Sequence, residues 1–275
     1  MALFRKKDPN YDMNFLDHLE ALRWHVVRSV IVICTLGVIA FFNKELIFDG
    51  IILAPKNANF WTYRMMCLLG QKLNVDMCIT QIDFSVINLD ISGQFTTHMW
   101  VAFVTGCVLG FPYLVWELWR FISPALSEKE IKYSRGIVFF TSILFLIGIL
   151  FGYYIISPLS INFLGSYHVS EEIRNQISMD SYINIVTVMT LSSGLVFELP
   201  MVIYFLSKIG IMTPTFMRKY RKHAMIVNLI IAAVITPSPD VTSQMLVAIP
   251  LFLLYEISIF VSAAVERNKN KNSIA

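Results

Sequence analysis

The stretch MWVAFVTGCVLGFPYLVW, residues 99–116, decides the fold class because it is an apolar run of nearly membrane-spanning length. At a rise of about 1.5 Å per residue, such a run comes close to crossing a hydrocarbon core of about 30 Å. The following ELWRFISPALSEKE, residues 117–130, brings charged residues, and Pro112 and Pro124 bracket the transition. Aromatic side chains at the end of an apolar run are typical of the membrane–water interface. The stretch therefore predicts a membrane-spanning helix followed by a rigid segment at the bilayer surface.

The composition of the whole chain supports the same class. Of its 275 residues, 56% are hydrophobic and 15% are charged, whereas soluble domains are about half apolar and about a quarter charged. We predict an all-α integral membrane protein with one domain over residues 1–275. The net charge of +3 is too small to indicate a nucleic-acid partner. The first apolar run begins only near Val26 and no small-residue cleavage site follows it, so we do not expect a cleaved signal peptide.

The apolar segments predict about six membrane-spanning helices joined by two large outer loops and one short outer turn. The spans are expected at about 26–42, 99–116, 137–156, 182–206, 224–235 and 245–265, and the outer connections at about 43–98, 157–181 and 236–242. The fifth segment reaches only about 18 Å as a helix. We expect it to pair with the sixth in a short hairpin, in which Pro237 and Pro239 of TPSPD stop the helix.

Within the first outer loop, two stretches suggest local structure. NFWTYRMMCLLGQKL, residues 59–73, is expected to form a helix, and DFSVINLDISG, residues 83–93, could be extended. Cys67 and Cys78 also lie in this loop, on the side of the membrane where an oxidising environment would allow a disulfide. The alternative is two separate buried thiols.

The positive charges predict the orientation of the spans. Lys and Arg gather on the cytoplasmic side of membrane proteins, and here most of them lie before the first span, between the second and third, between the fourth and fifth, and after the sixth. On the other side lie only Lys44, Lys56, Arg64, Lys72 and Arg174. Both termini are therefore expected in the cytoplasm.

The chain carries no catalytic or metal-binding signature that we recognise. H-E-x-x-H, G-x-S-x-G and the Walker A lysine loop are absent, and the five histidines lack metal-ligand spacing. We therefore expect no enzyme activity, no metal and no cofactor. Glu198 lies inside the fourth apolar segment, where an ionisable group is a functional candidate; the alternative is a protonated side chain bonded to another helix. Gln244 and Glu256 lie nearer to the ends of the sixth segment.

Two stretches could form a recognition surface. In FLDHLEALRWHV, Phe15, Leu19, Leu22 and Val26 form one apolar stripe of a helix. Asp17 and Glu20 point away from that stripe. This pattern fits an interfacial helix that leads into the first span, or a cytoplasmic recognition face. The segment around Pro124 presents carboxylates near the lipid surface, where a carboxylate can bind a guanidinium bidentately.

In these stretches the sequence resembles the TatC family of the twin-arginine protein translocase. The resemblance rests on FLDHLEALR (15–23), LAPK (53–56), FPYLVWELWRFISPALSEKE (111–130), FELP (197–200) and TPSPDVTSQMLVAIPLFLLYEISI (236–259). It implies a concave six-helix bundle in the bacterial inner membrane with both termini inside. It further implies a receptor that exports folded proteins bearing twin-arginine signal peptides by using the proton-motive force. The implied partners are TatA, with or without a separate TatB, membrane lipids and further copies of the chain.

The resemblance also implies roles for particular residues. The signal peptide would be bound by the N-terminal segment and the first cytoplasmic loop, at Asp17, Leu19, Glu20, Arg23, Phe121, Pro124, Leu126 and Glu130. Glu198 and Gln244 would face a partly wet pocket where the single-span partners dock. The structural prolines would be Pro55, Pro237, Pro239 and Pro250.

One departure from the family pattern concerns the N-terminal motif. The family usually has a glutamate directly before the Leu-Arg pair, where this chain has Ala21 and places Glu20 one residue earlier. One step along a helix turns a side chain by about 100°. We therefore expect Glu130 to carry more of the recognition, with help from Glu20 or Asp17.

A proton-coupled transporter of a small solute is the competing interpretation. It would also have about six spans and an intramembrane glutamate. Such transporters usually show inverted repeats and paired broken helices, and we find neither pattern in the sequence.

Overall fold

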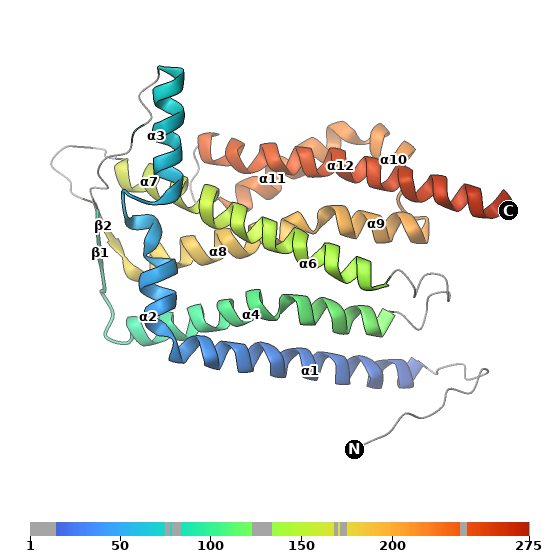
Figure 1. Ribbon diagram of the computed structural model, residues 1–275, viewed down its shortest axis with the longest axis horizontal. Coiled ribbons are helices and arrows are strands. Elements are labelled where there is room, and N and C mark those ends of the chain that lie inside the picture. The colour runs from blue at the N-terminus through green and yellow to red at the C-terminus, as the bar shows by residue number, and fades with distance from the viewer. Residues whose placement is uncertain are drawn as a thin grey trace.

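The fold is a row of long helices with small elements gathered at one end (Figure 1). It is seen in a computed structural model that describes residues 15–74, 78, 84–122, 134–167, 170, 175–236 and 241–274. The helices that form the row are α1 (Phe15–Phe42), α4 (Gly93–Ile122), α6 (Ser134–Phe151), α8 (Met179–Phe197), α9 (Leu199–Ile209), α11 (Arg221–Ile235) and α12 (Val241–Ile274). The start of α1 and the end of α12 lie at the same end, which we call the terminal end. We call the opposite end the loop end.

The loop end carries most of the short elements. They are α2 (Lys44–Ile47), the π-helix η1 (Phe48–Ile52), the 3-10 helix η2 (Ala54–Lys56), α3 (Trp61–Leu73), β1 (Ser85–Ile87), the π-helix η4 (Gly152–Ile156), α7 (Ser157–Ser166) and β2 (Gln176–Ser178). The short α10 (Pro214–Lys219) lies instead between α9 and α11, at the terminal end. The helix expected over residues 59–73 is thus found as α3, whereas only Ser85–Ile87 of the stretch expected to be extended over 83–93 forms a strand, β1.

Five helical segments of the described chain are long and apolar enough to cross a membrane. They are Leu19–Phe42, Gly93–Ile122, Gly136–Ser166, Met179–Ile209 and Val247–Arg267. This confirms the prediction of a helical membrane protein. The helix α11 is only 15 residues long, or about 22 Å, and does not reach that length. A sixth crossing therefore stays a prediction.

Several helix ends differ from the sequence-based boundaries. The second helix does not stop at residue 116 but runs to Ile122, because Pro112 is accommodated inside it and Glu117 is paired there. The loop expected over 157–181 begins with the helix α7, which continues the third span. The fourth span, expected over 182–206, is one helical segment over Met179–Ile209 with a single-residue interruption at Glu198.

The other helices also extend beyond their expected limits. The first begins at Phe15, so the helix expected over FLDHLEALRWHV continues into the first span, and the fifth begins at Arg221 instead of about residue 224. The last begins at Val241 and continues to Ile274, well into the polar tail. The apolar pattern marks the part of each helix that suits lipid, and a helix can continue into water beyond it.

Glycines bring the long helices into close contact. A Cβ added to Gly106 of α4 would lie 2.6 Å from the carbonyl oxygen of Ile33 and 2.9 Å from the backbone nitrogen of Gly37, both in α1. Added to Gly148 of α6, it would lie 2.8 Å from the Cα of Gly194 in α8. Small residues at such crossings let two backbones approach, which is how helices associate in lipid.

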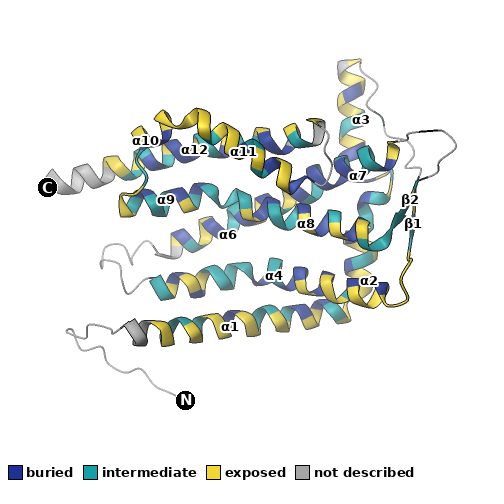
Figure 2. Cartoon of the chain, turned by 180° about the vertical axis from the view of Figure 1, so that it is seen from behind, coloured by how far each residue is buried: buried dark blue, intermediate teal, exposed yellow. Residues whose placement is uncertain are grey.

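Burial is distributed as expected for a bundle that lipid surrounds. Figure 2 shows buried positions along α8 and α12, whereas much of α1 is exposed. In the second half of α1 most exposed side chains are nevertheless apolar, as at Val30, Ile31, Val38 and Ile39. A continuous exposed apolar surface on a long helix is the surface that a bilayer covers.

Neutral hydrogen bonds and strand pairing hold the loop end together. The hydroxyl of Tyr63 in α3 donates to the carbonyl oxygens of Pro55 (3.0 Å) and Pro158 (2.9 Å), and burial raises the pKa of Tyr63 above its ordinary value. The hydroxyl of Tyr182 donates to the carbonyl of Ile52 at 3.0 Å. The strands β1 and β2 pair in parallel, with Val86 opposite Ile177, and so join the two large loops.

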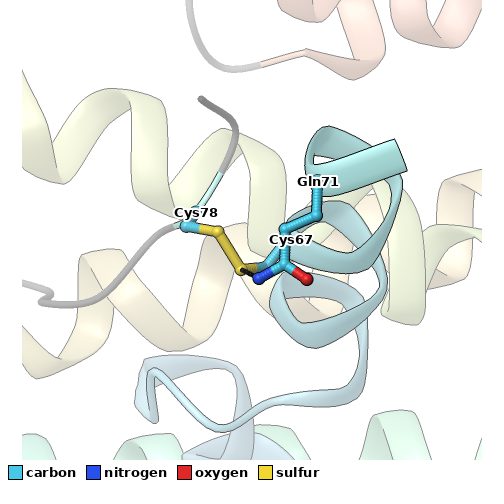
Figure 3. Close-up of a disulfide and its surroundings, with 3 residues drawn as sticks. All are labelled: Cys67, Gln71 and Cys78. Carbon is cyan, nitrogen blue, oxygen red and sulfur yellow. Dashed lines mark hydrogen bonds between the residues drawn. A yellow bond between two sulfur atoms is a disulfide. The ribbon is translucent and has the colours of Figure 1, made fainter. Parts of the chain in front are cut away.

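A disulfide joins Cys67 of α3 to Cys78 in the chain that follows (Figure 3). The bond spans 11 residues and ties the C-terminal half of α3 to the loop. The side-chain amide of Gln71 lies one turn further along α3, 3.8 Å from the sulfur of Cys67. Pro55, expected to be structural, is buried in η2.

Replacing Gly106 with alanine tests the close contact of α1 and α4. The new Cβ would meet backbone atoms that cannot move independently, so we expect Gly106→Ala to lower the unfolding free energy by about 1–3 kcal/mol. Gly136 is the matched control, because an added Cβ meets nothing within 4 Å there. Gly136→Ala should be neutral or stabilise the helix by up to about 1 kcal/mol. Denaturant titration in detergent measures both, and equal effects would contradict the packing argument.

Candidate functional site: a polar seam between α1 and α4

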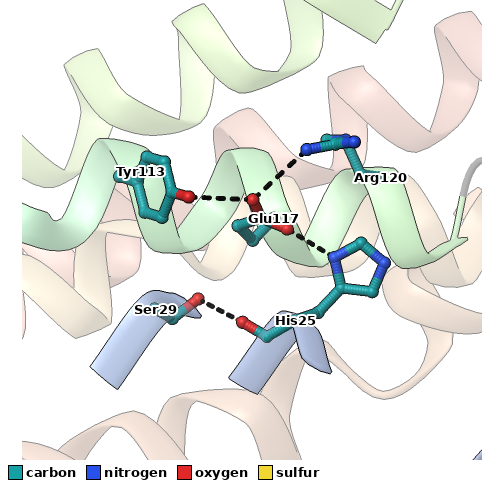
Figure 4. Close-up of polar contacts among 5 residues, drawn as sticks. All are labelled: His25, Ser29, Tyr113, Glu117 and Arg120. Carbon is teal, nitrogen blue, oxygen red and sulfur yellow. Dashed lines mark hydrogen bonds and ion pairs between the residues drawn. The ribbon is translucent and has the colours of Figure 1, made fainter. Parts of the chain in front are cut away.

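A cluster of polar side chains lies between α1 and α4 near the terminal end (Figure 4). At its centre is Glu117, whose side chain is only 1% exposed. The hydroxyl of Tyr113 donates to its Oε1 at 3.0 Å, and Nη1 of Arg120 donates to the same atom at 3.3 Å. Nδ1 of His25, from α1, bonds to its Oε2. We call these four residues the polar seam.

The helical repeat explains how the sequence builds this cluster. Tyr113, Glu117 and Arg120 are spaced i, i+4 and i+7, which places them on one side of α4. His25 faces them from α1, and the hydroxyl of Ser29, one turn further, donates to the carbonyl of His25 at 2.9 Å. A buried carboxylate is costly unless it is paired and hydrogen-bonded. The seam supplies partners to both oxygens of Glu117.

Aromatic contacts extend the seam. The guanidinium of Arg120 lies 4.9 Å from the ring centre of Trp116. At this distance the cation is attracted to the face of the aromatic ring. The ring of Phe121 lies 6.0 Å from the ring of His25, edge to face. Phe121 was predicted from the sequence to bind the signal peptide, and the structure places it against the first turns of α1.

The N-terminal candidates occupy different faces of α1. Ala21 is one turn from His25, so it lies on the side that faces α4. Glu20 is five residues from His25, or about 140° around the helix, and its side chain is exposed. Leu19 is also exposed, and the guanidinium of Arg23 lies 5.7 Å from the ring of Trp24. Glu20 thus does not replace a glutamate at position 21 in the seam.

Several predicted site residues cannot be placed. Pro124, Leu126 and Glu130 lie outside the described residues, and so do the side chain of Asp17 and the turn prolines Pro237 and Pro239. The role of Glu130 therefore stays a prediction. The helix α4 ends at Ile122, and the segment that carries Glu130 follows it in the sequence.

Glu198 lies at a break in the fourth span. It ends α8 and precedes α9, in which Pro200 takes one of the first two positions. Its Oε1 is buried and has no hydrogen-bond partner among the described residues. A buried carboxylate oxygen without a partner is unusual, which makes Glu198 a candidate for a polar contact.

Gln244 lies instead within the hairpin of α11 and α12. Its side-chain amide donates to the carbonyl of Leu229 at 3.1 Å, so it bonds the two helices to each other. In the described part of the chain no hydrogen bond joins Gln244 to Glu198. Pro250 lies inside α12, further along the same helix.

Sequence reasoning missed the two central residues of the seam. Glu117 was placed only in the charged segment that follows the second apolar run, and His25 was given no role, although an ionisable residue inside an apolar helix is itself a functional signal. The i, i+4, i+7 spacing of Tyr113, Glu117 and Arg120 would have shown a polar side of α4. No local pattern shows that His25 is the partner from α1. Among the described residues, no cluster of His, Cys, Asp and Glu could hold a metal ion.

A double-mutant cycle at His25 and Glu117 measures the strength of the seam. We expect a coupling free energy in the upper part of the range of about 0.5–3 kcal/mol that contacting residues show. The control is the pair of Arg221 in α11 and Glu256 in α12, whose side chains are 49% and 33% exposed. An exposed pair should couple by about 0.2–1 kcal/mol. The unfolding free energy is measured for His25→Gln, Glu117→Gln and their double variant. The same measurement is made for Arg221→Gln, Glu256→Gln and their double variant. A buried pair that couples no more strongly than the exposed one would contradict the role of the seam.

Comparison with known proteins identifies the chain. Residues 17–250 match the family described as Sec-independent protein translocase protein (TatC). The TatC protein of Blattabacterium sp. subsp. Periplaneta americana is 39% identical over 96% of this chain and 100% of its own length. The TatC protein of Carboxydothermus hydrogenoformans is 32% identical over 91% of this chain and 93% of its own.

The fold comparison agrees. The crystal structure described as the twin-arginine translocase receptor TatC superimposes with a TM-score of 0.69 and 30% identity, covering 90% of this chain and 99% of that one. Nothing in these relatives favours the competing interpretation, a transporter of small solutes. The chain belongs to the TatC family and is a subunit of a Sec-independent protein translocase.

Proposed function

We propose that this chain binds twin-arginine signal peptides at its terminal end, on a surface formed by the start of α1, the end of α4 and the segment that follows α4. The observation that carries the proposal is the contact between His25 and Phe121. It brings together the two stretches, far apart in sequence, in which the resemblance to the family places signal-peptide recognition. The solved relative is itself described as a twin-arginine translocase receptor.

The terminal end faces the cytoplasm in this proposal. Figure 1 places the start of α1, the end of α4, the start of α6, the end of α9 and the end of α12 at that end. These are the places near which most Lys and Arg residues of the sequence gather, as the positive-inside rule requires of cytoplasmic segments. The membrane would be the inner membrane of a bacterium, with α11 as the sixth crossing and both termini inside.

Glu130 is the main guanidinium ligand in this account. A carboxylate can accept two parallel hydrogen bonds from an arginine and only a less directed contact from a lysine. Glu20 is on the far side of α1 from the seam, and Glu117 is already paired. The seam has a positioning role, because His25 and Glu117 hold the start of α1 and the end of α4 at a fixed separation. Leu19, Arg23, Phe121, Pro124 and Leu126 would line the bound peptide.

Partner subunits would dock where the bundle holds unpaired polar groups. Glu198 offers a buried oxygen without a partner, and a polar side chain from a single-span helix could bond to it. Such interhelical hydrogen bonds are worth about 0.6–2 kcal/mol in membranes. The partners would be TatA, with or without TatB, and further copies of this chain. Together they would export folded cargo with the proton-motive force as the energy source.

Substitution of the two candidate carboxylates tests the recognition site. Loss of a hydrogen bond to a charged group costs about 1.5–3 kcal/mol, so Glu130→Gln should weaken binding of a twin-arginine peptide about ten- to a hundredfold. Glu20→Gln, the matched control on α1, should leave binding nearly unchanged. Photocrosslinking of the peptide to the detergent-solubilised protein measures both, with a twin-lysine peptide as the reference. Normal binding to Glu130→Gln together with its loss in Glu20→Gln would contradict the assignment.

The short α11 predicts a thinned bilayer around the last hairpin. A helix of about 22 Å cannot cross a core of about 30 Å without local thinning. Spin labels at the exposed Ile226, Ile230 and Val234 should therefore cover a smaller range of depths in the bilayer than a full crossing would. Labels along the third span, which is long enough to cross the membrane, are the control. Depths along α11 that match a full crossing of about 30 Å would contradict this prediction.

A further inference from the structure

The helix α3 presents three distinct faces. Thr62 and Tyr63 are buried against the bundle, where Thr62 bonds to the carbonyl of Tyr154 and Tyr63 to that of Pro158. A second face carries the polar residues Arg64 and Gln71, both exposed, and Cys67. The third face carries the apolar residues Trp61, Met65, Leu68 and Leu69, and the exposed Lys72 lies within the same arc in the last turn of the helix. The four residues of this apolar face lie within an arc of about 100°, and each is 40–56% exposed.

The helix lies crosswise at the loop end of the bundle. In Figure 1 its axis runs across the direction of the long helices, and it extends sideways beyond α7. Its bonds to Tyr154 and Pro158 place it beside the last turns of the third span, Gly136–Ser166, not beyond them. A helix in this position lies in the plane of the membrane at the level where the apolar span ends.

The apolar face of α3 continues a surface that lipid must cover. The ring of Trp61 lies 5.7 Å from that of Tyr154, edge to face. Leu150 and Ile147, one and two turns before Tyr154 on the same side of the third span, are each about half exposed. Ile147, Leu150 and Tyr154 form one stripe of a membrane-spanning helix, and Trp61 extends this stripe onto α3 without a polar boundary.

The remaining side chains also suit a bilayer surface. Tryptophan is enriched at the membrane–water interface, and Arg64 and Lys72 are exposed cations close to the apolar face. Long cationic side chains at such positions extend toward the phosphate groups. An amphipathic helix with these features lies in the interface with its apolar face in the acyl region.

We propose that α3 is an interfacial anchor whose apolar face is buried in the outer leaflet of the bilayer. The disulfide between Cys67 and Cys78 fixes the C-terminal half of the helix to the chain that follows. The assignment to the outer leaflet rests on the orientation under the proposed function. The contact with lipid itself rests only on the geometry of α3, so it can fail while signal-peptide binding holds, and the reverse.

Spin labels on the faces of α3 test the proposal in the full-length protein. Cys34 and Cys107 are first replaced with serine, and the native disulfide is retained. Labels are attached in the variants Met65→Cys and Leu69→Cys on the apolar face, and in the matched controls Arg64→Cys and Gln71→Cys on the polar face. The protein is placed in vesicles of phosphatidylethanolamine and phosphatidylglycerol. Collisions with oxygen, which concentrates in lipid, are compared with collisions with a water-soluble nickel complex.

We expect the ratio of oxygen to nickel accessibility to be high on the apolar face of α3 and low on its polar face. Labels at 65 and 69 should favour oxygen, and labels at 64 and 71 should favour nickel. Strong nickel accessibility at all four positions would show that α3 stands in water and would overturn the proposal. Low accessibility to both reagents at 65 and 69 would overturn it as well, because the face would then be covered by protein, such as a second copy of the chain.

Discussion

The burial of one carboxylate between two helices is the constraint on which the recognition end depends. Glu117 is almost fully enclosed, and an unpaired charge there would be strongly destabilising, by about 3–5 kcal/mol. Its partners come from two elements: Tyr113 and Arg120 from α4, and His25 from α1. The pairing therefore fixes the rotation of α1 relative to α4. Gly37 and Gly106 bring the same two helices into contact further along, so α1 and α4 form one unit.

The two ends of the bundle are stabilised by different interactions. The terminal end depends on charge, through the polar seam and the pair of Arg221 and Glu256. The loop end has no ion pair among the described residues and depends on hydrogen bonds from Tyr63, Tyr182 and Thr97, the last to the carboxylate of Asp180, on strand pairing and on a disulfide. This division fits the proposed roles. Recognition of a cationic peptide needs charge close to water, whereas a scaffold at the opposite membrane surface needs rigidity and contact with lipid.

The sequence predicted most of the architecture and only part of the candidate site. Apolar runs predict the long helices, and the sequence also predicts α3 and an extended stretch around β1. The end of α4 was missed because Glu117 is stabilised inside that helix by His25, a partner 92 residues away in sequence. The parallel pairing of β1 with β2 is likewise a contact between distant segments. Local patterns describe one helix at a time, whereas the seam exists only where two helices meet. The motif resemblance named Phe121, whose ring lies beside that of His25, and its role in binding stays a prediction.

Binding of a twin-arginine peptide to the variant His25→Leu tests the central claim most directly. The affinity of the purified full-length protein is compared with that of Ser29→Ala, a neighbouring change on α1 that leaves Glu117 paired. If the seam positions the two halves of the site, His25→Leu should bind the twin-arginine peptide more weakly and distinguish it less from a twin-lysine peptide, while it remains folded by thermal unfolding. Unchanged affinity and unchanged discrimination in folded His25→Leu would contradict the account.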